Sequence, residues 1–254
     1  MRTFLLAALL LPASALAGGY QHIPAGEFHS MLQYEAGAGL RRVAAFELMR
    51  EPVTNAEFLA FVRAHPQWRR DRVLPLYADR DQYLSHWQAV LALGAQAGPR
   101  QPVTRVSWFA ARAYCEAQSA RLPTWDEWEY VAAADDTQRD ARTNPAWSAR
   151  ILDWYARNAA APLPEVGRTA ANAYGVVDLH GLVWEWTDDY ASMLVTGDNR
   201  SQQDSERYKF CGAGALSVAD RENYPVMMRV ALLSSLRAVD STSSLGFRCA
   251  RSLP

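Results

Sequence analysis

The sequence predicts an α+β fold, a single domain that contains much irregular backbone. Three segments have the capped, amphipathic pattern of short helices, and short strand-like segments precede and follow them. Glycine, asparagine and proline residues interrupt the rest of the chain. With 254 residues, half of them hydrophobic, the chain can bury one sizeable core. No repeat, low-complexity tract or linker divides it, so one domain is favoured over two small ones.

The first 17 residues have the pattern of an export signal. Arg2 provides the positive end, residues 4–11 form a short apolar core, and Ala15 and Ala17 are small residues of the kind that signal peptidase reads. The alternative is a buried strand or helix, and the apolar run is too short to cross a bilayer. We expect cleavage after Ala17, a mature domain of residues 18–254, a periplasmic location and no membrane span.

Two strands and a helix are expected in the first third of the chain. The strands are predicted at residues 20–24 and 43–48. The helix follows in "EPVTNAEFLAFVRAHP", where Thr54 is the N-cap, Glu57 completes a capping box and Pro66 ends the helix. Its apolar stripe consists of Phe58, Phe61 and Val62.

Two further helices are predicted between residues 102 and 134. Ser107 caps the first, and its buried face is expected to carry Phe109, Ala113, Tyr114 and Ala117. Thr124 caps the second, Glu127 completes its capping box, and Trp128 and Val131 face inward. Residues 135–165 are expected to be irregular, and short strands separated by glycine and asparagine are expected after them.

Charge and cysteine usage exclude several classes of function. The net charge is −1, which gives no support for binding to nucleic acid or to an anionic membrane. The chain has three cysteines, Cys115, Cys211 and Cys249, without a Cys-x-x-Cys motif or a histidine pair at helical spacing. A zinc site or a redox motif is therefore not indicated. Export permits disulfides, and one pair with one cysteine left over is the simplest arrangement.

Five blocks, in order, resemble the formylglycine-generating enzyme family, also called sulfatase-modifying factors. Together they cover nearly all of the mature chain. The resemblance implies that family's fold, a single α+β domain related to C-type lectins. The blocks are "IPAGEF" at 23–28, "EPVTNAEFLAFV" at 51–62, "PVTRVSWFAARAYCEAQSARLPTWDEWEYVAAA" at 102–134, "NAYGVVDLHGLVWEW" at 172–186 and "LGFRCA" at 245–250.

The resemblance also identifies a departure from the family's chemistry. Active members oxidise a sulfatase cysteine to formylglycine with dioxygen and copper(I) held by two cysteines, and the matching positions here are Ser217 and Pro225. Copper(I) in a linear bis-thiolate site needs two soft sulfur ligands. A hydroxyl is a hard donor and proline offers no ligand, so we expect neither copper nor formylglycine generation. Cys211 would lie about 20 Å from Ser217 along an extended strand, too far to substitute.

The resemblance implies a disulfide between Cys115 and Cys249, and the alternative is two buried free thiols. Cys211 is then a free thiol, an intermolecular bridge, or a soft metal ligand together with Met227 or Met228.

A calcium loop of the family matches residues 178–185. It implies Ca²⁺ bound by the side chains of Asp178 and Glu185 and by the backbone carbonyls of Gly181 and Val183. The alternative is that Glu185 pairs with an arginine and no ion binds.

A substrate pocket is a further implication, with Trp184, Tyr224 and Arg229 as its candidate walls beside Ser217. His180 is interpreted as a structural histidine rather than a base. No Ser-His-Asp set, phosphate loop or nucleotide fingerprint is present.

Three functions remain open. The blocks "LHGLVWEW", "FCGAGAL" and "MR…SSL" are most similar to NirV-type members, which predicts a pseudoenzyme with an accessory or maturation role toward a periplasmic metalloenzyme. The candidate partner is a copper nitrite reductase of denitrification. The second function is a periplasmic oxidase or isomerase of a small molecule. The third is a binding or regulatory module, with a partner face formed by Trp68, Tyr77, Tyr83 and Trp87 unless that segment simply packs on the core.

Overall fold

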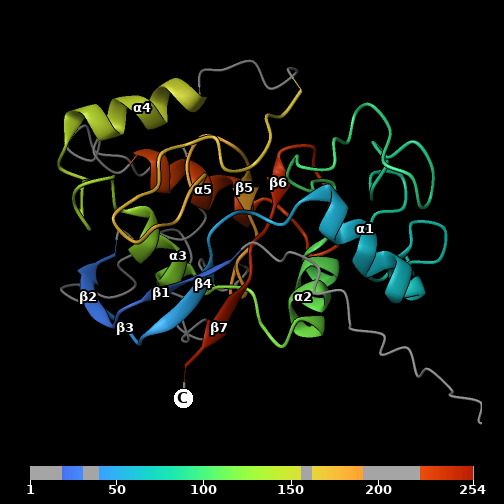
Figure 1. The fold of residues 1–254 in the computed structure, drawn as a ribbon, viewed down its shortest axis with the longest axis horizontal. Helices are drawn as coiled ribbons and strands as arrows, with labels where there is room; N and C mark the ends of the chain where they lie inside the picture. Colours follow the sequence, from blue (N-terminus) through green and yellow to red (C-terminus); the bar gives the residue numbers. More distant parts are fainter. Residues whose placement is uncertain (1–18, 31–39, 156–161, 191–223, 254) are drawn as a thin grey trace, which may run out of the picture.

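Short strands from both ends of the chain lie side by side in one sheet (Figure 1). The computed structural model describes residues 19–30, 40–155, 162–190 and 224–253. The predicted export signal, Cys211 and Ser217 lie outside these ranges. The elements, in chain order, are β1 (Tyr20–Ile23), β2 (Gly26–His29), β3 (Leu40–Val43), β4 (Phe46–Met49), α1 (Asn55–Ala64), the 3-10 turn η1 (Pro66–Trp68), α2 (Trp108–Ala117), α3 (Trp125–Ala132), α4 (Pro145–Tyr155), β5 (Trp184–Glu185), α5 (Tyr224–Ser234), β6 (Leu245–Gly246) and β7 (Ala250–Ser252).

Strand β4 is the centre of a three-stranded antiparallel sheet of order β1-β4-β7. Phe46 pairs with Ile23 of β1 on one side and with Ser252 of β7 on the other. Phe46 and Leu48 are buried, as the alternation of a half-buried strand requires. Strands β2 and β3 form a separate antiparallel pair, and β5 pairs with β6 in parallel.

The predicted strand at 20–24 is confirmed by β1, but the single strand predicted at 43–48 is wrong. The structure has two strands there, separated by Ala44 and Ala45. Strand β3 pairs with β2, whereas β4 pairs with β1 and β7. The chain thus changes sheets at the two alanines, which an apolar pattern alone does not reveal.

Helices α1, α2 and α3 begin at the predicted caps. The side chains of Thr54, Ser107 and Thr124 each accept a hydrogen bond from a backbone N–H of the first turn. Glu57 and Glu127 complete the two predicted capping boxes. These predictions are confirmed because a cap depends only on residues within four positions of each other.

The buried face of α2 differs from the prediction. Tyr114 is buried as expected, but Phe109 and Ala113 are only half-buried and Ala117 is exposed. The face of α2 that carries Cys115 points inward, because a disulfide joins this residue to the core. The buried residues are Ala110, Ala111, Tyr114 and Cys115.

Helices α4 and α5 were not predicted. The region 135–165, expected to be irregular, contains α4, and a strand-rich region contains α5. A local signal for α4 was present, since Asn144 Oδ1 accepts a hydrogen bond from the N–H of Ala146 and Pro145 occupies the first helical position. Helix α5 likewise has Pro225 in its first turn.

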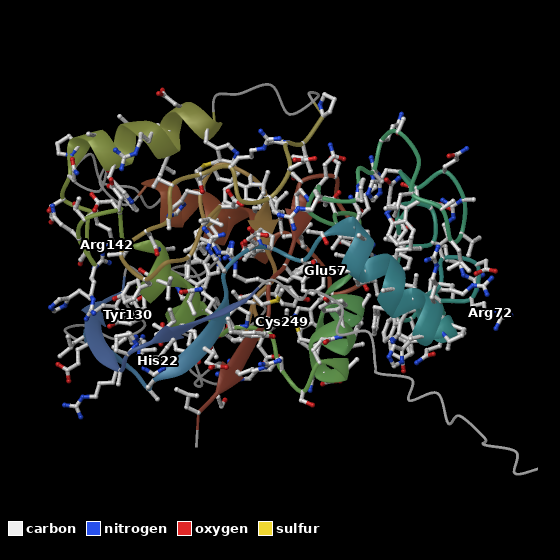
Figure 2. All side chains as sticks on the ribbon, viewed as in Figure 1. His22, Glu57, Arg72, Tyr130, Arg142 and Cys249 are labelled. Carbon is white, nitrogen blue, oxygen red and sulfur yellow. A yellow bond between two sulfur atoms is a disulfide. The ribbon has the colours of Figure 1, made fainter. Side chains whose placement is uncertain are left out.

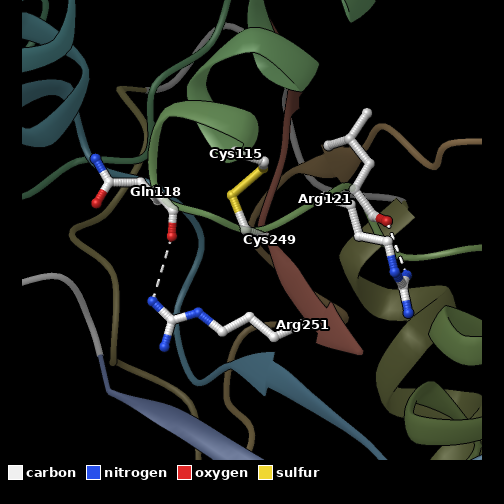
Figure 3. The surroundings of a disulfide bond; sticks show 6 residues. Cys115, Gln118, Arg121, Cys249 and Arg251 are labelled. Carbon is white, nitrogen blue, oxygen red and sulfur yellow. Dashed lines mark hydrogen bonds between the residues drawn. A yellow bond between two sulfur atoms is a disulfide. The ribbon is translucent and has the colours of Figure 1, made fainter. Parts of the chain in front are cut away.

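Cys115 and Cys249 form a disulfide, which confirms the predicted pairing. Both residues are fully buried, and Cys249 lies near the middle of the molecule (Figure 2). The bond joins α2 to the segment that leads into β7 (Figure 3). It therefore links the helical half of the core to the central sheet across 134 positions of sequence.

Replacing both half-cystines by alanine is expected to lower the free energy of unfolding by about 5 kcal/mol, because the unfolded chain loses the constraint of a long closed loop. Urea denaturation of the mature protein, followed by tryptophan fluorescence, measures the change. Cys211→Ala leaves this disulfide intact and is the control. Equal midpoints for the double variant and this control would contradict the structural role.

Candidate functional site

The site is built around a buried ion pair between Glu185 of β5 and Arg248, which precedes Cys249. Both side chains are fully buried. Arg248 Nε lies 3.0 and 2.9 Å from the two carboxylate oxygens, and its Nη2 donates to Glu185 Oε1 at 2.7 Å. This two-pronged geometry is the strongest form of ion pair that arginine makes.

The remaining donors of Arg248 are also used. Nη1 donates to the carbonyl oxygens of Met49 and Arg50, at 3.0 and 3.1 Å, and Nη2 donates to that of Val177 at 3.0 Å. Every nitrogen of the guanidinium therefore has an oxygen partner, as burial of a charge requires. One arginine thus connects the end of β4, the segment before Asp178 and β5.

Two tryptophans and a second arginine cover this ion pair. Trp128 Nε1 of α3 donates to Glu185 Oε2 at 2.8 Å. The guanidinium of Arg229 lies 3.7 Å from the ring centre of Trp128 and 5.3 Å from that of Trp125. Arg229 Nη2 also donates to the backbone carbonyl of Glu185. Cation–π contacts with two rings stabilise a guanidinium away from water.

The structure describes the side chains of two of the three predicted pocket residues. Arg229 is only 1% exposed and lies in the buried aromatic layer rather than on an open wall. Trp184, next to Glu185 in sequence, is half-buried, with its ring 5.2 Å from that of Trp154 in α4. Tyr224 opens α5, but its side chain lies outside the described part of the structure. Pro225, which the sequence resemblance aligns with a copper ligand, lies in the first turn of α5.

Asp178 closes a tight loop. Its φ of 62° is in the left-handed region that non-glycine residues rarely adopt. Its carboxylate accepts hydrogen bonds from the N–H of Gly167 and from both the N–H and the hydroxyl of Thr169. In return, the N–H of Asp178 donates to the Thr169 hydroxyl at 2.7 Å. This carboxylate is therefore committed to holding two loops together.

The predicted calcium ligands do not fit a calcium ion in this geometry. Ca²⁺ takes six to eight oxygen ligands. Both Glu185 oxygens are instead occupied by Arg248 and Trp128, and the guanidinium would repel a divalent cation beside it. Within the described ranges, no three His, Cys, Asp or Glu residues are grouped so as to hold a metal. Gly181 and Val183 lie on the turn between Asp178 and Glu185, and the pairing of Glu185 with an arginine is the arrangement observed.

His180 has the structural role that was predicted. Its Nε2 lies 2.8 Å from the carbonyl oxygen of Ala132, and its ring is set edge-to-face against Trp128 and Trp147. Burial among these rings lowers the pKa of His180 to about 4, and the nearby Arg229 and Arg248 act in the same direction. The ring is therefore neutral near pH 7.

The number of cysteines rules out a two-thiolate metal site within one chain, wherever such a site would lie. Of the three cysteines in the chain, two are joined in the disulfide. Only Cys211 is left, so no pair of thiolates within one chain is available for a linear copper(I) site.

Comparison with known proteins identifies the family. The sequence model of the sulfatase-modifying factor enzyme 1-like domain matches residues 13–253. The chain belongs to this family. It is a single FGE-sulfatase domain with mixed helix and sheet, and the family resemblance expected from the sequence is confirmed.

Relatives in the family carry different activities in their names. A hercynine oxygenase from Mycolicibacterium smegmatis is 31% identical over 207 residues, which cover 70% of this chain but only 47% of the relative. A formylglycine-generating enzyme from Streptomyces coelicolor is 28% identical, with 82% of this chain and 79% of the relative covered. An "inactive C-alpha-formylglycine-generating enzyme 2" from Bos taurus is 30% identical, with coverage of 78% and 74%. The family thus contains members that do not generate formylglycine.

The solved structure of PvdO from Pseudomonas aeruginosa is similar over 92% of this chain and 94% of its own. The sequence identity is 20% and the TM-score is 0.48.

Sequence reasoning missed the residue that organises the site. Arg248 lies in the block "LGFRCA", but its partner is 63 positions away, and no local pattern pairs them. Trp125 and Glu129 were also missed. The available signal was the cluster of aromatic residues in α3, whose indole N–H groups need acceptors when buried. Trp125 Nε1 donates to the buried Glu129 at 2.8 Å.

Glu185→Gln is expected to lower the free energy of unfolding by about 3–5 kcal/mol, because it leaves the Arg248 guanidinium buried without a counter-charge. The matched control is Glu27→Gln, which breaks the exposed pair with Arg42 and is expected to cost less than about 1 kcal/mol.

Calcium or a chelator is expected to leave the melting temperature of the wild type unchanged. Calorimetry checks both, and a calcium-dependent rise in Tm would contradict the ion-pair interpretation.

Stability is expected to fall in acid through His180. The folded pKa of about 4 lies below the usual 6.5, so the unfolded chain binds the proton more readily. The contribution of neutral His180 to the free energy of unfolding is complete above about pH 6.5. It falls by about 3 kcal/mol as the pH is lowered to about 4. His180→Gln retains a donor for Ala132 and cannot titrate. Urea unfolding across this range should give that variant a shallower pH dependence, and parallel curves would exclude His180 as the cause.

Proposed function

We propose that this chain is an exported pseudoenzyme of the family that assists maturation of a periplasmic metalloenzyme. The candidate client is a copper nitrite reductase. The proposal is supported by the shortage of thiols: the disulfide uses two of the three cysteines, and the positions that the resemblance aligns with the copper ligands hold Ser217 and Pro225. An intact family scaffold without the family's thiolates retains its shape but not that oxidation.

The polar groups of the site favour a scaffold over a catalyst. A general acid or base must be able to reach the proton it transfers. The carboxylates of Glu185 and Asp178 and the guanidinium of Arg248 are instead used in hydrogen bonds within the protein. The neutral His180 lies between two tryptophans and bonds a backbone carbonyl. These groups hold loops together.

The periplasmic assignment rests on two features. The first 17 residues have the three parts of an export signal. A structural disulfide is typical of proteins that fold in an oxidising compartment. The proposed client is drawn from the similarity of "LHGLVWEW", "FCGAGAL" and "MR…SSL" to NirV-type members, and is the most specific part of the proposal.

A second candidate is an enzyme with non-cysteine chemistry. The observation in its favour is the 31% identity to a hercynine oxygenase, a family member whose name denotes an oxygenase. The chain spans about half the length of that relative. The other half of the hercynine oxygenase does not align with this chain, so the accessory role is the favoured function.

Two assays test the proposal. Purified mature protein is supplied with copper(I), air and a sulfatase-derived cysteine peptide. It is expected to form no more aldehyde than its Cys211→Ala variant does, and an active formylglycine-generating enzyme is the positive control. The client nitrite reductase, produced without this chain, is expected to have reduced copper content that co-expression restores. Aldehyde formation would refute the pseudoenzyme, and full copper loading in the absence of the chain would refute the accessory role.

A further inference from the structure

An exposed apolar turn lies in the long segment between η1 and α2. Five large hydrophobic residues are exposed in the described ranges, and three of them lie within four positions. Leu74 is 56% exposed, Leu76 69% and Tyr77 38%, and Pro75 between them is exposed as well. Such residues occur singly on most surfaces, whereas a contiguous group marks an interaction site.

The turn is held rigidly. It is anchored by Val73 and Ala78, which flank it and are buried in the main core. The N–H of Tyr77 donates to the carbonyl of Leu74 at 2.8 Å, and the N–H of Asp79 donates to the carbonyl of Val239 at 2.9 Å. The exposed leucines are therefore presented by a fixed backbone, so little ordering entropy would be lost on binding.

Aromatic rings support one side of the turn. Tyr77 contacts Trp68 of η1 and Phe109 of α2, with ring centres 5.9 and 5.4 Å apart. Phe109 in turn contacts Trp108 at 5.4 Å. These three neighbours are half-buried, which explains why Phe109 does not point into the core as the sequence predicted. We define residues 74–77 with Trp68 and Phe109 as the apolar ridge.

The residues of the apolar ridge differ from those predicted for a partner face. Of the four aromatic residues expected there, Tyr83 and Trp87 belong to the core, with exposures of 0% and 2%. Trp68 and Tyr77 remain on the surface side. Leu74 and Leu76, which were not predicted, have the largest exposed fractions among the large hydrophobic residues that the structure describes.

Two arginines border the apolar ridge. Arg72 and Arg80 are exposed, and Arg80 Nε donates to the carbonyl of Val73, directly before the turn. Neither forms an ion pair with a carboxylate in the described part of the chain, whereas the adjacent Arg69 is paired with Asp71 at 2.8 Å. Arg72 lies at the end of the molecule away from Tyr130 and Arg142 (Figure 2). The ridge thus combines apolar projections with two exposed arginines that lack a carboxylate partner in the described ranges, and one exposed carboxylate, Asp81, lies next to Arg80.

We infer that the apolar ridge is the surface that docks onto the client protein, at an apolar cleft bordered by carboxylates. The inference rests on the proposed accessory function and assigns that function a surface. A symmetric contact between two copies would bring the arginines of both rims together, and like charges oppose that arrangement. The net charge of −1 gives no support for binding to an anionic membrane.

Binding is tested with purified mature protein and purified apo nitrite reductase. Leu74→Glu with Leu76→Glu is expected to weaken binding roughly 100-fold, since burial of two leucines is lost and negative charge meets the carboxylate rim. Leu40→Glu with Leu152→Glu changes two comparably exposed leucines elsewhere, 49% and 41%, and is the matched control. Arg72→Glu with Arg80→Glu is expected to slow association and to weaken its salt dependence. Unchanged binding by the leucine variant would overturn the docking surface and leave the accessory function standing.

A photo-crosslinking residue at position 76, compared with one at position 152, separates the remaining cases in living cells. Crosslinking at 76 alone, to the nitrite reductase, supports both proposals. Crosslinking at 76 to another identified protein supports the docking surface if its purified form binds with the same loss in the leucine variant, and refutes the proposed client. Crosslinking to a second copy, or equal yields at the two positions, would overturn the docking surface. So would a result in which the leucine variant loses binding to phosphatidylglycerol vesicles but to no protein.

Discussion

The ion pair between Glu185 and Arg248 is the interaction on which the rest of the structure depends. Two fully buried charges are tolerated only when each has a complete set of partners. Arg248 meets this requirement with carbonyls from the end of β4 and from the segment before Asp178. Glu185 meets it with the indole of Trp128. Because these partners come from three further segments, none of the three can leave its place without removing a hydrogen-bond partner from a buried charge.

The buried centre of the site is held together without a metal ligand set, by hydrogen bonds and ion pairs among the described residues. The polar centre is satisfied by side chains and backbone of the chain itself, and the disulfide ties α2 to the sheet nearby. Arg229 completes the layer by covering Trp128 and bonding the Glu185 carbonyl. None of these residues is Ser217 or Pro225, the positions that the sequence resemblance aligns with the family's copper ligands.

The same separation applies to the surface. The buried centre lies among β5, α3 and α5, whereas the apolar ridge lies in the segment between η1 and α2 (Figure 1). Val73 and Ala78 join the ridge to the main core, so its shape depends on the core even though its leucines face outward. The buried ion pair and the disulfide thus hold together the interior that supports the proposed docking surface.

The sequence by itself determined the family, the capped starts of α1, α2 and α3, and the shortage of thiols. Each of these is a matter of residues close together in the chain or of a simple count. The Asn-Pro start of α4 was equally local and was overlooked. Only the tertiary structure decided that Glu185 pairs with Arg248, that α2 turns Cys115 rather than Phe109 inward, and that Leu74 and Leu76 stay exposed. These outcomes depend on partners tens of residues away, and local patterns carry no information about which distant groups will meet.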